Sequence, residues 1–440
     1  MLSASVRLFT CGFFLASLIF GQNEDKYETN QRILRIRELG KRDAQAIPAL
    51  TPYLSDPNRN IRVEAVKAIV KIDTGNSLEP LVKAAHDNDP EIQIRATDGM
   101  TNYYVPGYVA KGGLTGSLTR GVRQVKSFFS ARNDQVIDAD VTVRPDVSQA
   151  LADEIGSGES MDSRANAARA AGILRARPAV PALVAALRSK DNQLIFESLI
   201  ALQKIHDPSA GPGVAFLAGD LDDRIQAADL ETIGVLRSLT SAPDVRSALT
   251  NARNTKTRRA ALEALAMLGI PGDRPVFQQY ANDKDADLRA AALEGLGRIR
   301  EPEDYPTLDQ AFNEKDADWK VHLAAAFALV DEGKLDASDF SPLRYLVENL
   351  DVRNHSSVAS AYLTELAMRD DVRRSLFPLV SDATKDQKLA LCSVFSASQS
   401  DDVIPVLNTL SKDIDPDVSF AAARALRIVQ AHSNTAPLQG

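Results

Sequence analysis

The alternation of apolar and polar positions between Leu288 and Phe312 predicts a helix, a turn and the start of a second helix. At a period of 3.6 residues, one face collects six small or apolar side chains: Leu288, Ala291, Ala292, Gly295, Leu296 and Ile299. Arg289, Glu294 and Arg298 fall off this face, and Leu293 lies beside it, which predicts neighbours on two sides. A proline is tolerated in the first turn of a helix, so Pro306 marks the start of the second helix.

The same pattern recurs along the chain. Each long alanine-rich helix has a first apolar position that serves as an anchor: Gln31, Ile61, Ile94, Ser163, Leu194, Ile225, Thr257, Leu288, Trp319, Val358, Gln387 and Val418. Most steps between anchors are 29 to 33 residues, but one is 69 (Ile94 to Ser163) and one is 39 (Trp319 to Val358). A fixed period in this range predicts a stacked helical solenoid.

Two further features repeat in phase with the anchors. A proline precedes the anchor by 13 residues (Pro48, Pro181, Pro212, Pro275, Pro306, Pro405) or by 14 (Pro80, Pro243), and predicts the start of the first helix of each pair. An acid and a base stand six residues apart in Asp56 and Arg62, Asp89 and Arg95, Asp283 and Arg289, Glu314 and Lys320, and Asp382 and Lys388. The acid falls in the inter-helix turn and the base in the first turn of the second helix, so stacking predicts a structural ladder of charges.

Paired helices, the turn proline, the acid-to-base spacing and segments such as IRVEAVKAIVKI and LRAAALEGLGRI resemble HEAT repeats. The short period is similar to that of the bacterial HEAT-like repeats first named after phycobilisome lyases. The resemblance covers roughly residues 30 to 430 and implies an all-α, right-handed α-solenoid of about 12 two-helix repeats. Such repeats imply protein binding, whereas lyase activity is not carried over, because no motif here defines a chromophore site.

The 69-residue step contains an insertion at about residues 103–144, followed by a first helix from Val147 to Ile155. Residues 101–133 hold no acid but several bases, with aromatic residues near both ends. The candidate contact residues for a partner or a membrane are Tyr104, Tyr108, Arg120, Arg123, Lys126, Phe128 and Phe129. Residues 118–130 form an amphipathic basic helix in this interpretation, and residues 136–143 an extended segment.

Three interpretations of the insertion stay open. Its apolar face docks on the solenoid and its basic face is solvated, or it binds an acidic protein partner, or it binds an anionic membrane surface. Solenoid insertions usually project from one face, so we expect this one to set specificity.

The two ends of the chain and its composition indicate where the protein is located. Residues 1–21 combine Arg7, an apolar run from Leu8 to Phe20 and a small-residue site before Gln22, which is typical of a secretory signal peptide. Residues 432–440 form a polar tail. The formal net charge of −8 disfavours nucleic acid as the main partner. Cys392 is the only cysteine outside the signal peptide, and its apolar position predicts a buried thiol.

The residues that could carry catalysis are scattered. The five histidines fall in different repeats, without HExxH, CxxC, GxSxG or a phosphate-binding loop. Trp319 occupies a repeat anchor and is expected to pack in the core. We therefore expect no metal, no cofactor and no catalytic residues. The favoured function is an exported, non-catalytic protein-binding scaffold in the periplasm or cell envelope, with a peripheral membrane module and an enzyme assembled across repeats as alternatives.

Overall fold

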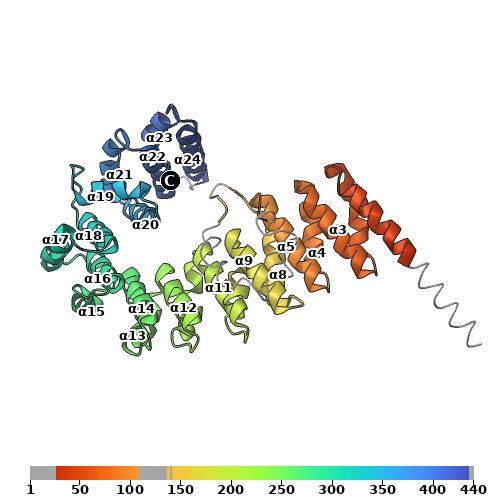
Figure 1. The fold of residues 1–440 in the computed structure, drawn as a ribbon, viewed down its shortest axis with the longest axis horizontal. Coiled ribbons are helices and arrows are strands. Elements are labelled where there is room, and N and C mark those ends of the chain that lie inside the picture. Colours follow the sequence, from red (N-terminus) through yellow and green to blue (C-terminus); the bar gives the residue numbers. More distant parts are fainter. Residues whose placement is uncertain (1–25, 109–135, 139–140, 436–440) are drawn as a thin grey trace, which may run out of the picture. The chain divides into compact units, whose positions relative to one another are not determined.

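The computed structural model describes residues 26–108, 136–138 and 141–435 (Figure 1). These residues form helices joined by turns, and no strand occurs among them. The described chain falls into two compact units: residues up to Ile137 with Val141–Asp207 form the first, and Asp138 with the residues from Pro208 onward form the second. The predicted signal peptide lies outside the described residues.

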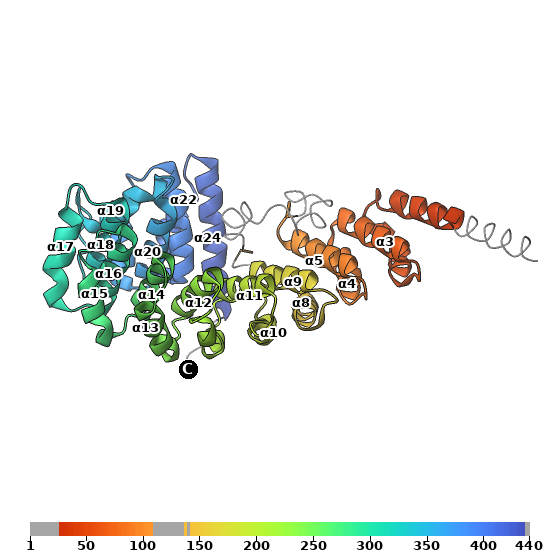
Figure 2. The ribbon, with the colours of Figure 1, turned by 60° about the horizontal axis from the view of Figure 1, so that its bottom comes forward.

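The first unit starts with a helix over residues 26–39. Its helices are then α2 (Ile47–Leu50), α3 (Arg59–Ile72), α4 (Gly75–Ala84), α5 (Pro90–Tyr104), α8 (Pro145–Ser157), α9 (Met161–Ile173), α10 (Val180–Ala186) and α11 (Asn192–Ile205). First and second helices alternate: α8 and α10 lie along one side of the stack, and α9 and α11 along the other (Figure 2). α8 confirms the predicted first helix that follows the insertion.

The second unit opens with two short 3-10 turns, η4 (Pro208–Gly213) and η5 (Ala215–Leu217). Its helices are α12 (Asp223–Val235), α13 (Ala242–Thr250), α14 (Thr255–Leu268), α15 (Arg274–Tyr280), α16 (Ala286–Ile299), α17 (Tyr305–Asn313), α18 (Trp319–Asp331), α19 (Pro342–Glu348), α20 (Ser356–Leu366), α21 (Asp370–Leu376), α22 (Lys385–Ser398), α23 (Ile404–Leu410) and α24 (Pro416–Thr435). In this unit α13, α15 and α17 follow the outside of a curve, and α14, α16 and α18 its inside (Figure 1). The fold is therefore an all-α solenoid of stacked helix pairs.

The second helix of each pair is packed between its neighbours. α16 contacts both α14 and α18, and α9 contacts both α5 and α11. Leu293, predicted to have neighbours on two sides, is fully buried. Small residues permit this close stacking, because a methyl group on Gly297 would come within 2.5 Å of the Ala328 backbone.

The turn prolines mark the start of the first helix in most repeats. Six of them stand at the first or second helical position: Pro48, Pro181, Pro243, Pro275, Pro306 and Pro405. The prediction is wrong for Pro80, which lies inside α4, because Thr74 and Ser77 form a capping box that starts this helix at Gly75. Pro212 lies in η4, where the first helix is replaced by 3-10 turns.

The C-terminal helix and the long step before Val358 complete the description. α24 continues to Thr435, four residues into the predicted polar tail, and residues 436–440 are outside the described chain. The additional residues of the 39-residue step form the loop between α18 and α19. This loop projects Phe340, which is 91% exposed and has a φ of 64°. A positive φ is unusual for a bulky residue.

Candidate functional site

The insertion can be followed only at its two ends. Arg120, Arg123, Lys126, Phe128 and Phe129 lie outside the described residues, as does the whole of the predicted basic helix, residues 118–130.

At the first end, the Tyr104 hydroxyl accepts a hydrogen bond from the Arg144 backbone N–H at 3.0 Å, and its ring meets Tyr103 edge-on at 5.0 Å. Tyr108 is only 5% exposed, so most of its side chain is covered by the protein. At the far end, the Ile137 N–H donates to the carbonyl of Ile173, the last residue of α9, at 2.9 Å.

The predicted charge ladder links consecutive repeats. Arg62 donates from Nε and Nη2 to the two carboxylate oxygens of Asp87 in the next turn, at 2.8 and 3.1 Å, and from Nη1 to the Asp56 carbonyl at 3.0 Å. Three other bases that follow an anchor by one residue, like Arg62, contact an acid in the next inter-helix turn. These pairs are Arg32–Asp56, Arg289–Glu314 and Lys388–Asp413. We call these four contacts the turn ladder. For Arg62, Arg289 and Lys388, the sequence spacing suggested a partner acid six residues earlier. The structure instead pairs each of these bases with the acid of the following repeat.

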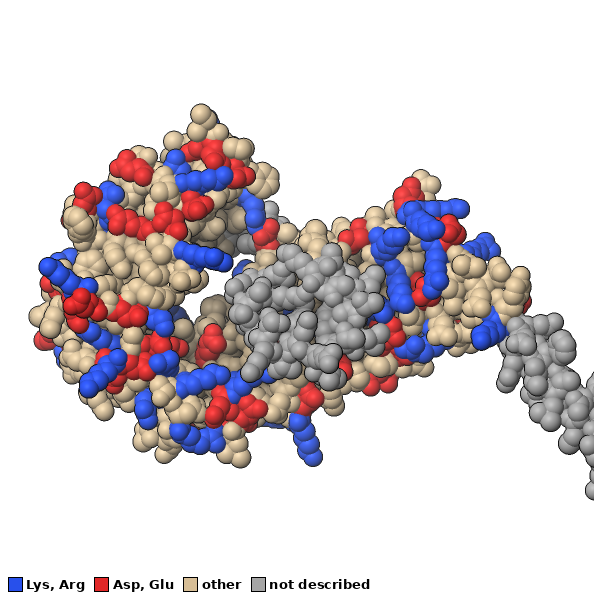
Figure 3. Space-filling model, in the orientation of Figure 1, with Lys and Arg blue, Asp and Glu red and all other residues tan. Residues whose placement is uncertain are grey.

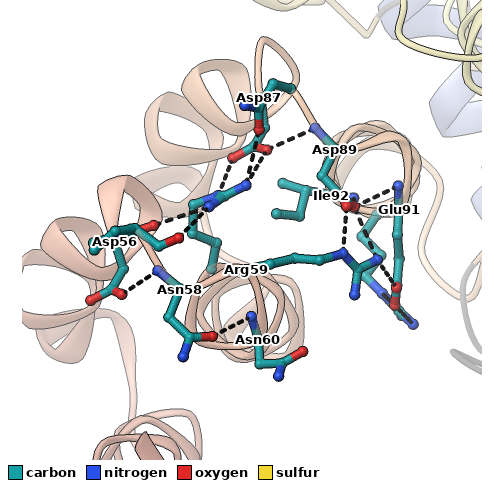
Figure 4. A network of polar contacts seen from close by, with 12 residues as sticks. Asp56, Asn58, Arg59, Asn60, Asp87, Asp89, Glu91 and Ile92 are labelled. Atoms are coloured by element: carbon teal, nitrogen blue, oxygen red, sulfur yellow. Dashed lines mark hydrogen bonds and ion pairs between the residues drawn. The ribbon is translucent and has the colours of Figure 1, made fainter. Parts of the chain in front are cut away.

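The other predicted ladder residues form contacts at the inter-helix turns and at the starts of the second helices. Asp89 caps α5 by accepting the backbone N–H groups of Glu91 and Ile92, and also receives Arg59 from the preceding second helix (Figure 4). Arg95 is buried and donates to Glu91 within α5. Asp283 accepts the backbone N–H of Asp285, which caps α16. These carboxylates stabilise helix N-termini, where backbone N–H groups lack partners.

A second ladder, which sequence reasoning missed, joins the first helices of the second unit. Three arginines make bidentate ion pairs to aspartates 27 to 30 residues later: Arg246–Asp273, Arg274–Asp304 and Arg373–Asp402, with Nε–O distances of 2.6, 2.7 and 2.7 Å. Asp273 and Asp304 are almost fully buried. The sequence signal is an aspartate two or three residues before the turn proline, at the start of the first helix. On the face shown in Figure 3, acidic and basic side chains are interleaved, as these two ladders require.

Acidic side chains stand in register on three consecutive second helices of the second unit. Glu231, Glu263 and Glu294 occupy the same position, six residues after the anchors of α12, α14 and α16. Glu231 and Glu263 are exposed, and the Glu294 side chain is mostly buried. Although the Glu263 side chain reaches solvent, the protein around it removes part of its hydration, and the neighbouring carboxylates of Glu294 and Glu231 add repulsion, so its pKa is raised to about 7. We call these three residues the acidic row.

The acidic row adjoins a charged and aromatic network centred on Arg298. The Arg298 guanidinium is paired with Glu294 on its own helix and donates from Nη2 to Glu365 of α20 at 2.6 Å. It also lies 4.7 Å from the centroid of the Phe327 ring, which stacks on Tyr362 at 4.5 Å. The Tyr362 hydroxyl donates to Glu294 at 2.7 Å.

The Glu365 carboxylate also receives an arginine from much earlier in the chain. Arg237, which follows α12, donates from Nη2 to Glu365 at 2.5 Å. Burial works to raise the pKa of Glu365, but Arg298 and Arg237 outweigh it and hold this pKa below its usual value. We call Arg237, Glu294, Arg298, Tyr362 and Glu365 the inner network.

Aromatic and sulfur-bearing residues have structural positions. Trp319 packs partly buried against the core of the second unit and stacks on His355 at 4.3 Å, while His355 contacts Asn349. Cys392 is buried, which confirms the prediction for its position, and burial raises the pKa of its thiol to about 12.

Among the described residues, no three His, Cys, Asp or Glu side chains are close enough to hold a metal ion. Within the same residues, no helix combines the length and apolar character needed to cross a membrane.

Two depressions occur at the surface of the second unit. One, of about 630 Å³, lies between α13, α14, α15 and α16, and the other, of about 450 Å³, lies between η5, α12 and α13. Both have mixed linings in which charged side chains take part, including Arg258 and Asp283 in the first and Asp244 and Arg253 in the second. Neither includes a residue of the inner network.

Known proteins resemble this chain only distantly. No curated protein matches the chain. The CpcE–CpcF complex of phycocyanin lyase from a Nostoc species shares 19% identity over 64% of this chain and 94% of that chain, with a TM-score of 0.37. Human deoxyhypusine hydroxylase shares 17% identity over 57% of this chain and 96% of that chain, with a TM-score of 0.28. A Kap121p mutant shares 12% identity over 87% of this chain and 45% of that chain, with a TM-score of 0.37. HEAT repeats match residues 22–101 and 242–330, so the chain contains HEAT repeats in both of its units.

Proposed function

We propose that this protein is an exported, non-catalytic scaffold that binds another protein along the second helices of its solenoid. The observation that carries the proposal is the acidic row beside the inner network. These side chains form an extended, repeat-spaced surface, where two of the three carboxylates of the row are exposed. An extended protein surface matches such a row better than a small molecule does, because small ligands favour enclosed pockets with apolar linings.

The insertion is proposed to contribute to partner choice. Its two ends are held, at Tyr104 by the Arg144 backbone and at Ile137 by the C-terminus of α9. An insertion fixed at both ends supports a contact surface without altering the stack of helices. The charge of residues 101–133, which include bases but no acids, supports an acidic partner.

Phe340 supports the same proposal at a different place. The loop that carries it is fixed, since Arg344 Nε donates to the Ala337 carbonyl at 3.0 Å and Ser341 caps α19. An exposed aromatic residue on a fixed loop is typical of a protein contact. The positive φ of Phe340 is energetically unfavourable, and the folded protein keeps this backbone conformation at an exposed site.

Site-specific photo-crosslinking tests the proposal. A photoreactive amino acid is placed at Glu263 on the acidic row or, as a control, at the exposed Gln310 on the outer helix α17. In cells, we expect one partner to be captured from Glu263 and not from Gln310. Equal capture from both positions, or none from Glu263 with the protein folded, contradicts the proposed surface.

The insertion is tested separately, with residues 109–135 replaced by a short glycine–serine linker and Tyr108 and Ile137 retained. Loss of the crosslinked partner, with unchanged helical circular dichroism, supports its role, and unaltered capture removes it. Sedimentation with anionic liposomes at low salt distinguishes the membrane alternative, which requires binding that falls as salt rises. Export is tested by the N-terminus of protein recovered from the envelope, expected to begin at Gln22.

A further inference from the structure

Repeats of a solenoid normally contact only their immediate neighbours. The inner network departs from this rule within the second unit. Glu294 and Arg298 of α16 contact Tyr362 and Glu365 of α20, although α18 stands between these helices in the stack. Arg237 reaches Glu365 across 128 residues, from the end of α12, with three second helices in between.

The distances show how strongly the unit must curve. Packed helices lie about 8–10 Å apart, so the four steps from α12 to α20 would span roughly 30–40 Å in a straight stack. The observed separation between Arg237 Nη2 and Glu365 Oε1 is 2.5 Å. Long side chains account for only part of this difference, so the curvature of the second helices closes the remainder.

The inner network contains contacts that are shielded from solvent and one ion pair that is exposed to it. Arg298 and Glu294 are largely shielded from solvent, with side chains 9% and 12% exposed, and the Phe327 ring lies against the guanidinium. Arg237 is 58% exposed and Glu365 34% exposed, so salt and water compete for this ion pair. The exposed pair is therefore the one that can open while the rest of the network stays formed.

We infer that the Arg237–Glu365 ion pair is a clasp that holds the second unit of the solenoid in a tightly curved form and that opens at high ionic strength. Opening separates the end of α12 from α20, while α16 stays joined to α20 through Arg298 and Tyr362. The inner face that carries the acidic row therefore widens between α12 and α16. This inference rests on the geometry of the second unit alone, and it stands whether or not the acidic row binds a partner.

Spin-label distance measurements test the clasp. Labels are attached at Leu239 and Met368, which are exposed and lie next to the two clasp residues without belonging to the network. The background carries Cys11→Ser, and Cys392 is buried, so it does not compete for the label. The perturbing variants are Arg237→Gln, which leaves the Glu365–Arg298 pair intact, and Glu365→Gln.

In 0.1 M salt we expect a single short distance in the unmodified network. The distance should rise by about 10 Å, on the order of one helix spacing, in Arg237→Gln, in Glu365→Gln and in 1 M salt. The control Arg289→Gln removes an exposed ion pair between adjacent repeats inside the same span and should leave the distance unchanged. Circular dichroism confirms that each variant is folded.

An unchanged distance in folded Arg237→Gln overturns the inference, as does a distance that does not respond to 1 M salt. If the distance changes equally in Arg289→Gln, ion pairs between adjacent repeats set the curvature and the clasp does not. Partner capture from Glu263 is a separate measurement, so failure of the proposed function is distinguished from failure of the clasp.

Discussion

Glu154 offers the sharpest test of the energetics in the first unit. This α8 residue is 3% exposed. Its Oε2 accepts a hydrogen bond from the Thr97 hydroxyl at 2.6 Å, and its Oε1 has no hydrogen-bond partner among the described residues. Burial, with a smaller effect from the Asp98 carboxylate, raises the pKa of Glu154 to about 8. The buried carboxyl is therefore protonated at neutral pH.

The magnitude follows from linkage. The unfolded chain releases this proton near its ordinary pKa of 4.5, whereas the folded unit keeps it until about pH 8. Because the folded state then binds more protons, stability falls as pH rises between these values and is constant outside them. At pH 7 the difference is about 2.5 pKa units at about 1.36 kcal/mol each, or between about 3 and 3.5 kcal/mol.

Replacement of Glu154 by Gln should remove this cost. The amide has the same shape and still accepts the Thr97 hydrogen bond. We expect Glu154→Gln to match the parent protein at pH 4 and to exceed its free energy of unfolding by about 3 kcal/mol at pH 7. This corresponds to roughly 6–12 °C in the melting temperature of a unit of this size.

The assay is hydrogen exchange of α8 peptides, combined with denaturant unfolding followed by circular dichroism, from pH 4 to 8.5. Peptide resolution matters because it reports on the first unit, which contains Glu154, separately from the second. Glu79→Gln, at an exposed position on α4, is the control and should show no pH-dependent gain. A gain for Glu154→Gln that does not change with pH, or a loss at pH 7, refutes the reasoning.

Three further predictions follow from packing, ion pairing and burial. Gly297→Ala should destabilise the second unit by about 1–3 kcal/mol, because the added methyl group meets Ala328, whereas Gly272→Ala, where a methyl group meets nothing within 4 Å, should be nearly neutral in thermal unfolding. Asp304→Ala should cost about 1–3 kcal/mol in denaturant unfolding, since it removes a buried carboxylate that accepts two guanidinium N–H groups, and a cost near zero would contradict the second ladder. Cys392 should react with maleimide only under conditions that open the second unit, and fast labelling of the folded protein would contradict its burial.

The fold could be predicted from the sequence because each repeat restates the same local rules. The positions of Leu288, Leu293 and Pro306 determine a face, a second contact and a helix start, and the structure has all three. Pro80 shows the limit of this reasoning. A capping box at Thr74 outweighs the usual meaning of the proline, and only the side-chain geometry decides between the two.

The candidate site was harder to predict because it depends on curvature. Glu294 and Arg298 are recognisable as polar residues off the apolar face of their helix, but nothing in their spacing indicates contacts with α20. The turn ladder shows the same limit in milder form, since sequence places Arg62 six residues after Asp56, yet its carboxylate partner is Asp87 of the next repeat. Contacts between repeats follow from the angle of the stack, which one repeat does not encode.

The central claim is that the second helices of the second unit bind a protein partner. The most direct test measures the affinity of the crosslinked partner, once purified, by calorimetry for the parent protein, Glu263→Lys and Gln310→Lys. The proposal predicts a loss of about tenfold or more, about 1.4 kcal/mol, for Glu263→Lys and no change for Gln310→Lys on the outer helix. Equal affinities for all three proteins would contradict it.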